Sequence, residues 1–114
     1  MSNIKTFGTR LKTLRRRKGI SQRELSANVG IDFTYISKIE NDQAPPPSEE
    51  AIIKIAHILD EDPDILLIAA NKIPERFKHL ICTNKYIFEL LKNADHLTPK
   101  QWKSIHQLIA ETKT

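Results

Sequence analysis

The chain has 114 residues, of which 39% are hydrophobic and 28% are charged, and this size indicates one small domain, alone or with an appendage. Its net charge of +4 is unevenly placed, because residues 1–43 hold nine of the 18 lysines and arginines but only four of the 14 acidic residues. A localised basic surface is typical of a protein that binds a polyanion. The longest apolar run, ILLIAA at 65–70, is too short to span a bilayer, which excludes a membrane helix.

The first helix is predicted over residues 4–18, where apolar residues recur at the spacing of one helix face. Gly19 follows and supplies the left-handed position that ends such a helix. The apolar stripe consists of Ile4, Phe7, Leu11 and Leu14.

Two short helices are predicted next, over 22–29 and 33–41. Ser21 and Glu24 form a capping-box pattern, in which each side chain satisfies the other's backbone amide at the start of a helix. Asp32 is a good N-cap for the following helix. Only three residues separate the two helices, so the link holds them at a steep angle, as in a helix-turn-helix unit.

Further helices are predicted in the rest of the chain. Three prolines make DQAPPPS, residues 42–48, a rigid loop, after which Ser48 caps a fourth helix. Asp62 and Pro63 open a fifth helix that runs to about residue 70. Beyond the linker 71–75 lie three amphipathic patterns, over 75–82, over 84–94 and from a second capping box at Thr98. The prediction is an all-α chain with a five-helix domain at 1–70 and about three helices at 76–114.

The stretch LKTLRRRKGISQRELSANVGIDFTYISKIENDQAPPPSEEAIIKIAHIL resembles the DNA-binding domain of the Xre family, which includes the lambdoid phage repressors and their Cro proteins. The resemblance covers about residues 4–70 and rests on several motifs in the same order and spacing. It implies a lambda-repressor-like helix-turn-helix fold. It also implies double-stranded DNA as a partner.

The helix at 33–41 is the predicted recognition helix, because a major groove admits one helix whose first turns meet the base edges. With Ile36 and Ile39 turned inward, polar and aromatic side chains are left on the outer face. The predicted base contacts are Phe33, Thr34, Ser37 and Lys38. Relatives often carry glutamine at 33 and 34, so the resemblance does not supply the base preference.

Phosphate contacts are expected around this helix, where they set register without reading sequence. The candidates are Gln22, which takes this role by the resemblance, and Arg23, Tyr35, Asn41 and Gln43. Tyr35 has packing against the second helix as its alternative. The resemblance also implies a buried ion pair between Arg15 and Glu40, which would tie the first helix to the third.

The last three helices offer more apolar surface than a five-helix domain needs, and a single helix-turn-helix domain reads only half of a two-fold DNA site. We therefore predict a homodimer contact in 76–114. Its predicted residues are Leu90, Leu91, Trp102, Ile105 and Ile109. The alternative is that this region folds back and caps the first domain.

The predicted function is a sequence-specific transcriptional regulator, in particular a repressor that binds a pseudo-palindromic operator as a homodimer in the cytoplasm. One alternative is an antitoxin-like or adaptor protein whose C-terminal helices bind a partner protein. The resemblance also leaves open a protease as a partner, because some repressors of the family carry a helical C-terminal region that a protease destroys. Another is a redox or ligand sensor using the lone Cys82 or a pocket between the two regions, although Cys82 is expected to be a small buried residue of the core. The four histidines lack metal-ligand spacing, and the sequence shows no nucleophile–base arrangement, phosphate loop or paired carboxylates. No metal, cofactor or catalytic site is therefore predicted, and the protein is not expected to be an enzyme.

Overall fold

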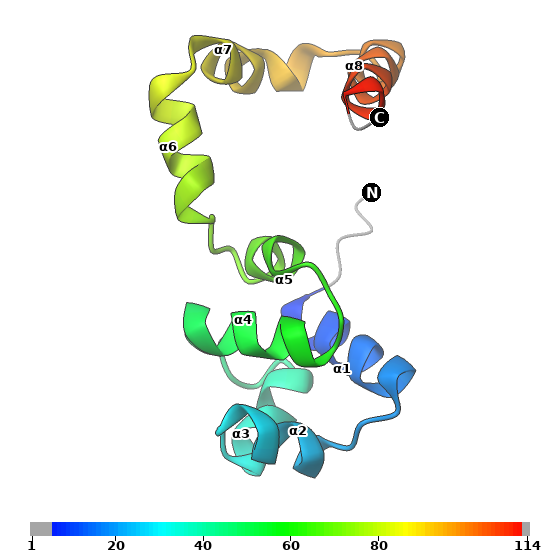
Figure 1. The fold of residues 1–114 in the computed structure, drawn as a ribbon, viewed down its shortest axis with the longest axis vertical. Helices are drawn as coiled ribbons and strands as arrows, with labels where there is room; N and C mark the ends of the chain where they lie inside the picture. Colours follow the sequence, from blue (N-terminus) through cyan, green and yellow to red (C-terminus); the bar gives the residue numbers. More distant parts are fainter. Residues whose placement is uncertain (1–5, 113–114) are drawn as a thin grey trace. The chain divides into compact units, whose positions relative to one another are not determined.

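A computed structural model describes residues 6–112 of the chain, and these residues form helices joined by turns, with no strand among them. The all-α prediction is confirmed. The chain divides into two compact units, one up to Pro74 and one from Glu75 onward (Figure 1). The first unit holds α1 Phe7–Lys18, α2 Gln22–Val29, α3 Phe33–Glu40, α4 Glu49–Ile58 and α5 Pro63–Ala69. The second holds α6 Glu75–Thr83, α7 Lys85–Asn93, the 3₁₀ turn η1 Ala94–His96 and α8 Pro99–Glu111.

Side-chain caps explain where the helices begin. Both predicted capping boxes are present: Ser21 Oγ accepts from the Glu24 amide at 3.0 Å, and Thr98 forms the same motif with Gln101. The first helix starts later than predicted, at Phe7, because Thr6 is extended and its hydroxyl accepts from the Thr9 amide. Ile4, which was predicted to lie on the apolar stripe of this helix, falls outside the described residues.

Two glycines end α1 and α2 where a left-handed backbone is needed. Gly19 has a φ of 77° and Gly30 a φ of 84°, values that other residues adopt at a cost. The backbone N–H of Gly30 closes α2 by donating to the Ser26 carbonyl. The turn between α2 and α3 therefore has a fixed shape.

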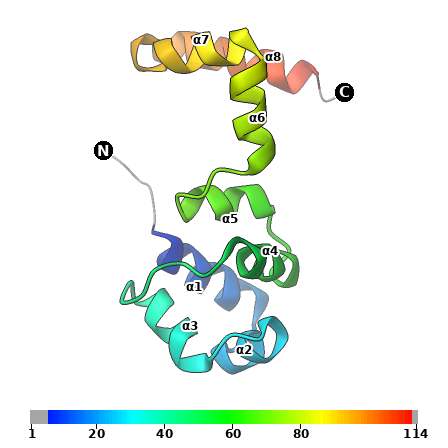
Figure 2. The same ribbon diagram turned by 90° about the vertical axis from the view of Figure 1, so that its left-hand side faces the viewer.

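The core of the first unit is made by all five of its helices. In Figures 1 and 2, α2 and α3 lie together at one end of this unit, while α4 lies between them and α5. The helices contact one another in the pairs α1 with α3 and α5, α2 with α3 and α4, and α4 with α5. The buried apolar residues are Phe7, Leu11, Leu14, Leu25, Val29, Ile36, Ile39, Ile52, Ile55, Ala56, Leu59, Leu66 and Leu67.

Gly8 marks a close approach between α1 and α3. A Cβ atom added at this position would lie 2.1 Å from the carbonyl oxygen of Ile39 and 2.7 Å from Asp42 Oδ1. No side chain fits there, so glycine lets α1 pack directly on the backbone at the end of α3. This contact positions α3 relative to α1, which carries six basic residues.

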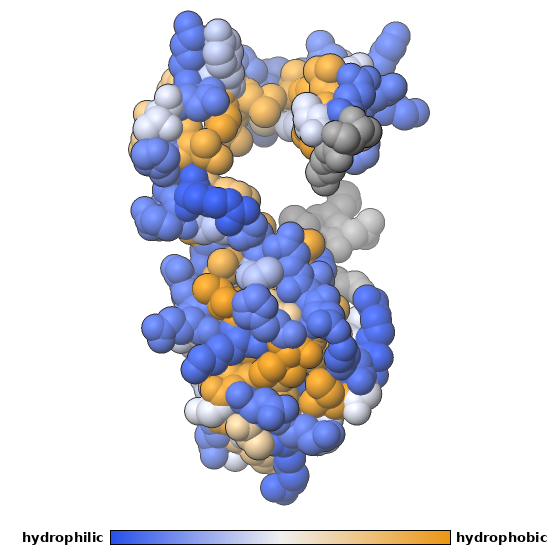
Figure 3. All heavy atoms as spheres, viewed as in Figure 1, coloured by the Kyte–Doolittle hydropathy of each residue, from blue (hydrophilic) through white to orange (hydrophobic). Residues whose placement is uncertain are grey.

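The second unit differs from the first in that α6, α7, η1 and α8 contain no buried residue. Its helices are amphipathic, and α6 contacts α7. Figure 3 shows hydrophobic side chains at the surface over these helices. The large apolar residues that are exposed here are Leu80, Tyr86, Phe88, Leu91, Trp102, Leu108 and Ile109.

Candidate nucleic-acid interface

The outer face of α3 exposes two of the four predicted base-contacting side chains to solvent. Thr34 and Lys38 are exposed and lie one turn apart, so they can enter a groove together. Phe33 and Ser37 were predicted to be exposed, and this is wrong, since both are half-buried. Phe33 is covered by Arg23 of α2, whose guanidinium carbon lies 4.4 Å from the ring centroid.

The start of α3 is fixed from both sides of the turn. Asp32 caps the helix by accepting from the Thr34 amide at 3.0 Å. On the α2 side, Ser26 donates its hydroxyl proton to the Ile31 carbonyl. These bonds, together with Gly30, hold the first turn of α3 against α2 without any long loop.

A buried ion pair joins α1 to the end of α3. Arg15 Nε donates to Glu40 Oε2 at 2.6 Å and Arg15 Nη2 donates to Glu40 Oε1 at 2.9 Å, and the two residues are only 8% and 4% exposed. Arg15 Nη1 also donates to the Ile20 carbonyl at 2.9 Å. The hydrogen bond to Glu40 raises the pKa of Arg15 above its ordinary value, so the guanidinium stays charged.

Gln22, at the start of α2, belongs to the same network. Its Nε2 donates to Glu40 Oε1 at 2.9 Å, so one carboxylate holds side chains of α1 and α2 while it lies at the end of α3. The Nε2 group has a second proton for another acceptor. Gln22 therefore connects the ion pair to the surface.

A basic hollow of about 430 Å³ lies beside Gln22, open to solvent. It brings three predicted phosphate contacts, Gln22, Arg23 and Asn41, together with cationic side chains of α1. The hollow is lined by Lys12, Arg15, Arg16, Ser21, Gln22, Arg23, Phe33 and Asn41. Because α2 begins at its rim, free amide groups and the positive end of the helix dipole add to these charges.

Lys12 is a lining residue that the sequence analysis missed. It lies four residues before Arg16 and three before Arg15, which places the three cations on one face of α1. Lys18, in the same basic run, instead pairs with Asp60 across the unit. That hydrogen bond lowers the pKa of the Asp60 carboxyl.

The other predicted phosphate contacts are Tyr35 in the first turn of α3 and two residues after its end, of which Asn41 also lines the hollow. Asn41 is exposed, and its Nδ2 donates to the Ser37 carbonyl at 3.0 Å. Gln43 is also exposed, and its backbone amide donates to the Lys38 carbonyl at 2.7 Å. Tyr35 is half-buried, packs against the core and donates its hydroxyl proton to the Pro45 carbonyl at 3.0 Å.

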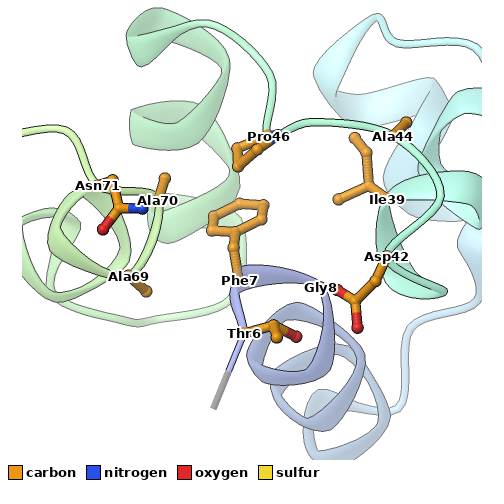
Figure 4. A pocket seen from close by; sticks show the side chains of 10 residues that line it. All are labelled: Thr6, Phe7, Gly8, Ile39, Asp42, Ala44, Pro46, Ala69, Ala70 and Asn71. Carbon is orange, nitrogen blue, oxygen red and sulfur yellow. The ribbon is translucent and has the colours of Figure 1, made fainter. Parts of the chain in front are cut away.

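A second hollow in the first unit shares no residue with the basic one. It has a volume of about 330 Å³ and lies where the start of α1 meets the end of α5. Figure 4 shows the Phe7 ring pointing toward Pro46 between these elements. Small apolar side chains such as Ala44, Ala69 and Ala70 make up much of the lining, and no charged cluster gathers there.

The remaining predictions concern a metal site, the lone cysteine and a membrane-spanning helix. Residues 6–112 contain no cluster of three or more His, Cys, Asp or Glu side chains that could hold a metal ion. Cys82 is exposed rather than buried, so its predicted role as a core residue is wrong. Of the helices in this part of the chain, none has the length and apolar character needed to cross a membrane.

Comparison with known proteins places this arrangement in a family. The sequence model of the helix-turn-helix family matches residues 11–66. The uncharacterized HTH-type transcriptional regulator RghRB of Bacillus subtilis is 31% identical over 91 residues, which are 77% of this chain and 66% of that protein. The HTH-type transcriptional regulator SinR of Bacillus subtilis is 35% identical over 61 residues, which are 54% of this chain and 55% of SinR.

Solved structures of SinR extend the likeness. A crystal structure of SinR, the master regulator for biofilm formation, in complex with DNA matches 54% of this chain and 98% of that chain, with 34% identity and a TM-score of 0.51. A structure of the SinR–SinI protein complex matches 95% of this chain and 98% of that chain, with 25% identity and a TM-score of 0.53. The present chain spans between about half and two thirds of the curated relatives' length. By its matched motif and these relatives, the chain belongs to the Xre-like helix-turn-helix family of transcriptional regulators.

Proposed function

We propose that this protein is a sequence-specific DNA-binding repressor that acts on a pseudo-palindromic operator as a homodimer. The observation that carries the proposal is the exposed start of α3, with Thr34 and Lys38 one turn apart, beside the basic hollow at the start of α2. The start of α3 could enter a major groove while the cations of the hollow neutralise the flanking phosphates. The DNA in the SinR complex supports the same class of ligand.

In this proposal the side chains divide into two sets. Thr34 and Lys38 meet base edges, with Phe33 and Ser37 at the margin because they are half-buried. The phosphate-binding set lines the hollow, except for Tyr35 of α3 and Gln43 of the following loop. It consists of Lys12, Arg16, Gln22, Arg23, Tyr35, Asn41 and Gln43. Arg15 and Glu40 act only through the positions of the helices, since their charges satisfy each other.

DNA selection tests the proposal directly. The full chain is incubated with a library of random duplexes, and bound DNA is amplified and sequenced. We expect enrichment of an inverted repeat with half-site centres about 34–36 Å apart, or a multiple of that distance. A promoter that overlaps the selected site should be repressed in a reporter strain, whereas an enriched site that activates the promoter would contradict the repressor assignment.

The base-reading face is tested with Lys38→Ala. We expect loss of preference for the selected duplex over random DNA, because Lys38 is exposed on the recognition helix and can donate to guanine. Circular dichroism should remain helical. Lys54→Ala is the matched control, since Lys54 is exposed on α4. An unchanged preference in Lys38→Ala would remove this residue from the reading set.

The dimer contact is assigned to the second unit because its helices bury no side chain by themselves. Of the predicted contacts, Leu91, Trp102 and Ile109 are exposed, while Leu90 and Ile105 are half-buried. Tyr86, Phe88 and Leu108 are exposed on the same helices and extend this apolar surface. A chain ending at Pro74 keeps the complete core of the first unit, so it should sediment as a folded monomer.

The same surface also supports a partner protein as a second candidate role. The likeness to SinR in its complex with SinI runs along nearly the whole chain, including the helices of the second unit. Binding of a different small helical protein here would compete with the homodimer. Sedimentation of the full chain alone separates the two cases, because a monomer at micromolar concentration would favour the partner protein.

A further inference from the structure

Arg23 and Phe33 form a stacked pair at the point where α2 meets the recognition helix. The Arg23 guanidinium carbon lies 4.4 Å from the centroid of the Phe33 ring. Within residues 6–112 the guanidinium donates no hydrogen bond and joins no ion pair. The stack therefore positions this cation while its N–H groups stay available for a ligand.

The place of the stack favours a base over a phosphate as that ligand. Phe33 is the first residue of α3, and the start of a recognition helix is the part that meets base edges. An aromatic ring gains nothing from a phosphate, whereas it packs well on the methyl group of thymine. A guanidinium that stacks on this ring is therefore close enough to contact the same base step.

The chemistry of arginine points to guanine. Its planar fork matches the O6 and N7 acceptors of guanine, and stacking on an aromatic face restricts the fork before the ligand arrives. Lysine carries the same charge without this geometry. A flexible cation of the hollow, such as the exposed Arg16, has no comparable ring to orient it toward a base.

We propose that Arg23 and Phe33 read one base step together, with the guanidinium on a guanine and the ring on the methyl of an adjacent thymine. This inference rests on the proposed function and moves Arg23 from the phosphate contacts to the base contacts. Phe33 acts in two ways, as a reader of the methyl group and as the residue that positions Arg23.

The test uses the full chain and the duplex that the wild-type protein selects from the random library. Arg23→Lys should lower the preference for one guanine in each half-site by about 10-fold or more, while leaving binding to duplexes altered at that position unchanged. Arg17→Lys is the matched control, since Arg17 is exposed on α1 and does not line the basic hollow, and it should keep the preference at every position. Phe33→Leu should lose the same guanine preference although Arg23 is intact.

Modified bases identify the atoms involved. Replacing the guanine with 7-deazaguanine removes the N7 acceptor. This should weaken DNA binding by the wild-type protein but not DNA binding by Arg23→Lys. Replacing the neighbouring thymine with deoxyuridine removes only the methyl group. This should weaken DNA binding by the wild-type protein. It should also weaken DNA binding by Phe33→Leu, because leucine still packs on a methyl group.

The possible failures are distinguishable. If the wild-type protein enriches no sequence, the proposed function fails and this inference fails with it. If a site is enriched but Arg23→Lys binds all duplexes more weakly by the same factor, Arg23 is a phosphate contact. In that case the inference is overturned and the proposed function stands. Circular dichroism of each variant shows that the helices are intact.

Discussion

The Glu40 carboxylate accepts three hydrogen bonds, two from Arg15 and one from Gln22, at a site that is almost closed to solvent. A buried charge that loses its partner costs much more than a surface pair contributes, because the remaining charge is no longer compensated. The contribution of this cluster is therefore to the relative positions of α1, α2 and α3. The cluster would affect DNA binding only by fixing the positions of these helices.

Glu40→Gln should lower the free energy of unfolding by about 3–5 kcal/mol, because Arg15 stays charged and buried without a counter-ion. Urea denaturation followed by circular dichroism measures this change. Glu49→Gln, an exposed acid at the start of α4, is the matched control and should stay within about 0.5 kcal/mol. A loss below 1 kcal/mol in Glu40→Gln would show that the carboxylate is dispensable. The double variant Arg15→Met/Glu40→Leu removes both charges and should recover most of the stability.

Gly8→Ala tests the close packing of α1 on the end of α3. The new methyl group would meet the Ile39 carbonyl at 2.1 Å, and such overpacking typically costs about 1–3 kcal/mol. Thermal unfolding of the full chain measures the loss. Gly30→Ala is a useful comparison, since open space surrounds that position and its cost is of backbone origin, about 1 kcal/mol. Equal stability of Gly8→Ala and the wild type would mean that the two helices can separate without loss.

At the scale of the helices, local caps and turns decide where each element lies. Ser21 starts α2 at the rim of the basic hollow, so its cap also determines which amides face the ligand. Asp32, Ser48 and Asp62 cap the next three helices in the same way. Each of these caps is worth about 1 kcal/mol.

Ser21→Ala should destabilise the first unit by about 1 kcal/mol, because the Glu24 amide loses its acceptor. Ser21→Gly should cost only a few tenths of a kcal/mol, since glycine is a tolerated N-cap. Comparing the two variants in urea isolates the cap from other effects of the hydroxyl. A larger loss in the glycine variant than in the alanine variant would contradict this account.

The helix order and the buried stripes were predictable because caps and apolar spacing are local signals, as at Ser21, Asp32 and Thr98. The half-burial of Phe33 was not, since it depends on the Arg23 side chain from another helix. The start of α1 was misjudged because Ile4 fits the apolar stripe, whereas the Thr6 cap decides the boundary. Lys12 was missed because a surface lysine gains meaning only when the hollow beside it is known.

At the scale of the whole molecule, the two units differ in how they gain stability. The first buries 13 apolar residues in one cluster, which supports folding without help. The second leaves Leu91, Trp102 and Ile109 about half exposed, at 54%, 42% and 50%. Apolar surface of this extent on α7 and α8 is typical of an interaction site.

Replacing these three residues together with serine should abolish the proposed homodimer, because burial of their side chains would supply much of its free energy. Sedimentation velocity at a concentration where the wild-type protein is dimeric measures the change. Ile68→Ser is the control, as Ile68 is equally exposed, at 48%, on α5 of the first unit. Affinity for a full operator should fall in the triple variant while affinity for a half-site is kept. A dimer that survives the three substitutions would place the contact elsewhere.

The missing core of the second unit has a consequence for how the protein responds to its own abundance. In the proposed homodimer these helices bury their apolar faces only against another copy, so mass action would stabilise them and their folded fraction would rise with the number of chains present. On dilution, the helical signal of residues 75–112 should fall while that of the first unit stays constant. A cell that makes few copies would then contain mainly monomers, which bind a half-site. A cell that makes many copies would contain mainly dimers, which bind the full operator. Gene dosage itself would thereby set a threshold for control.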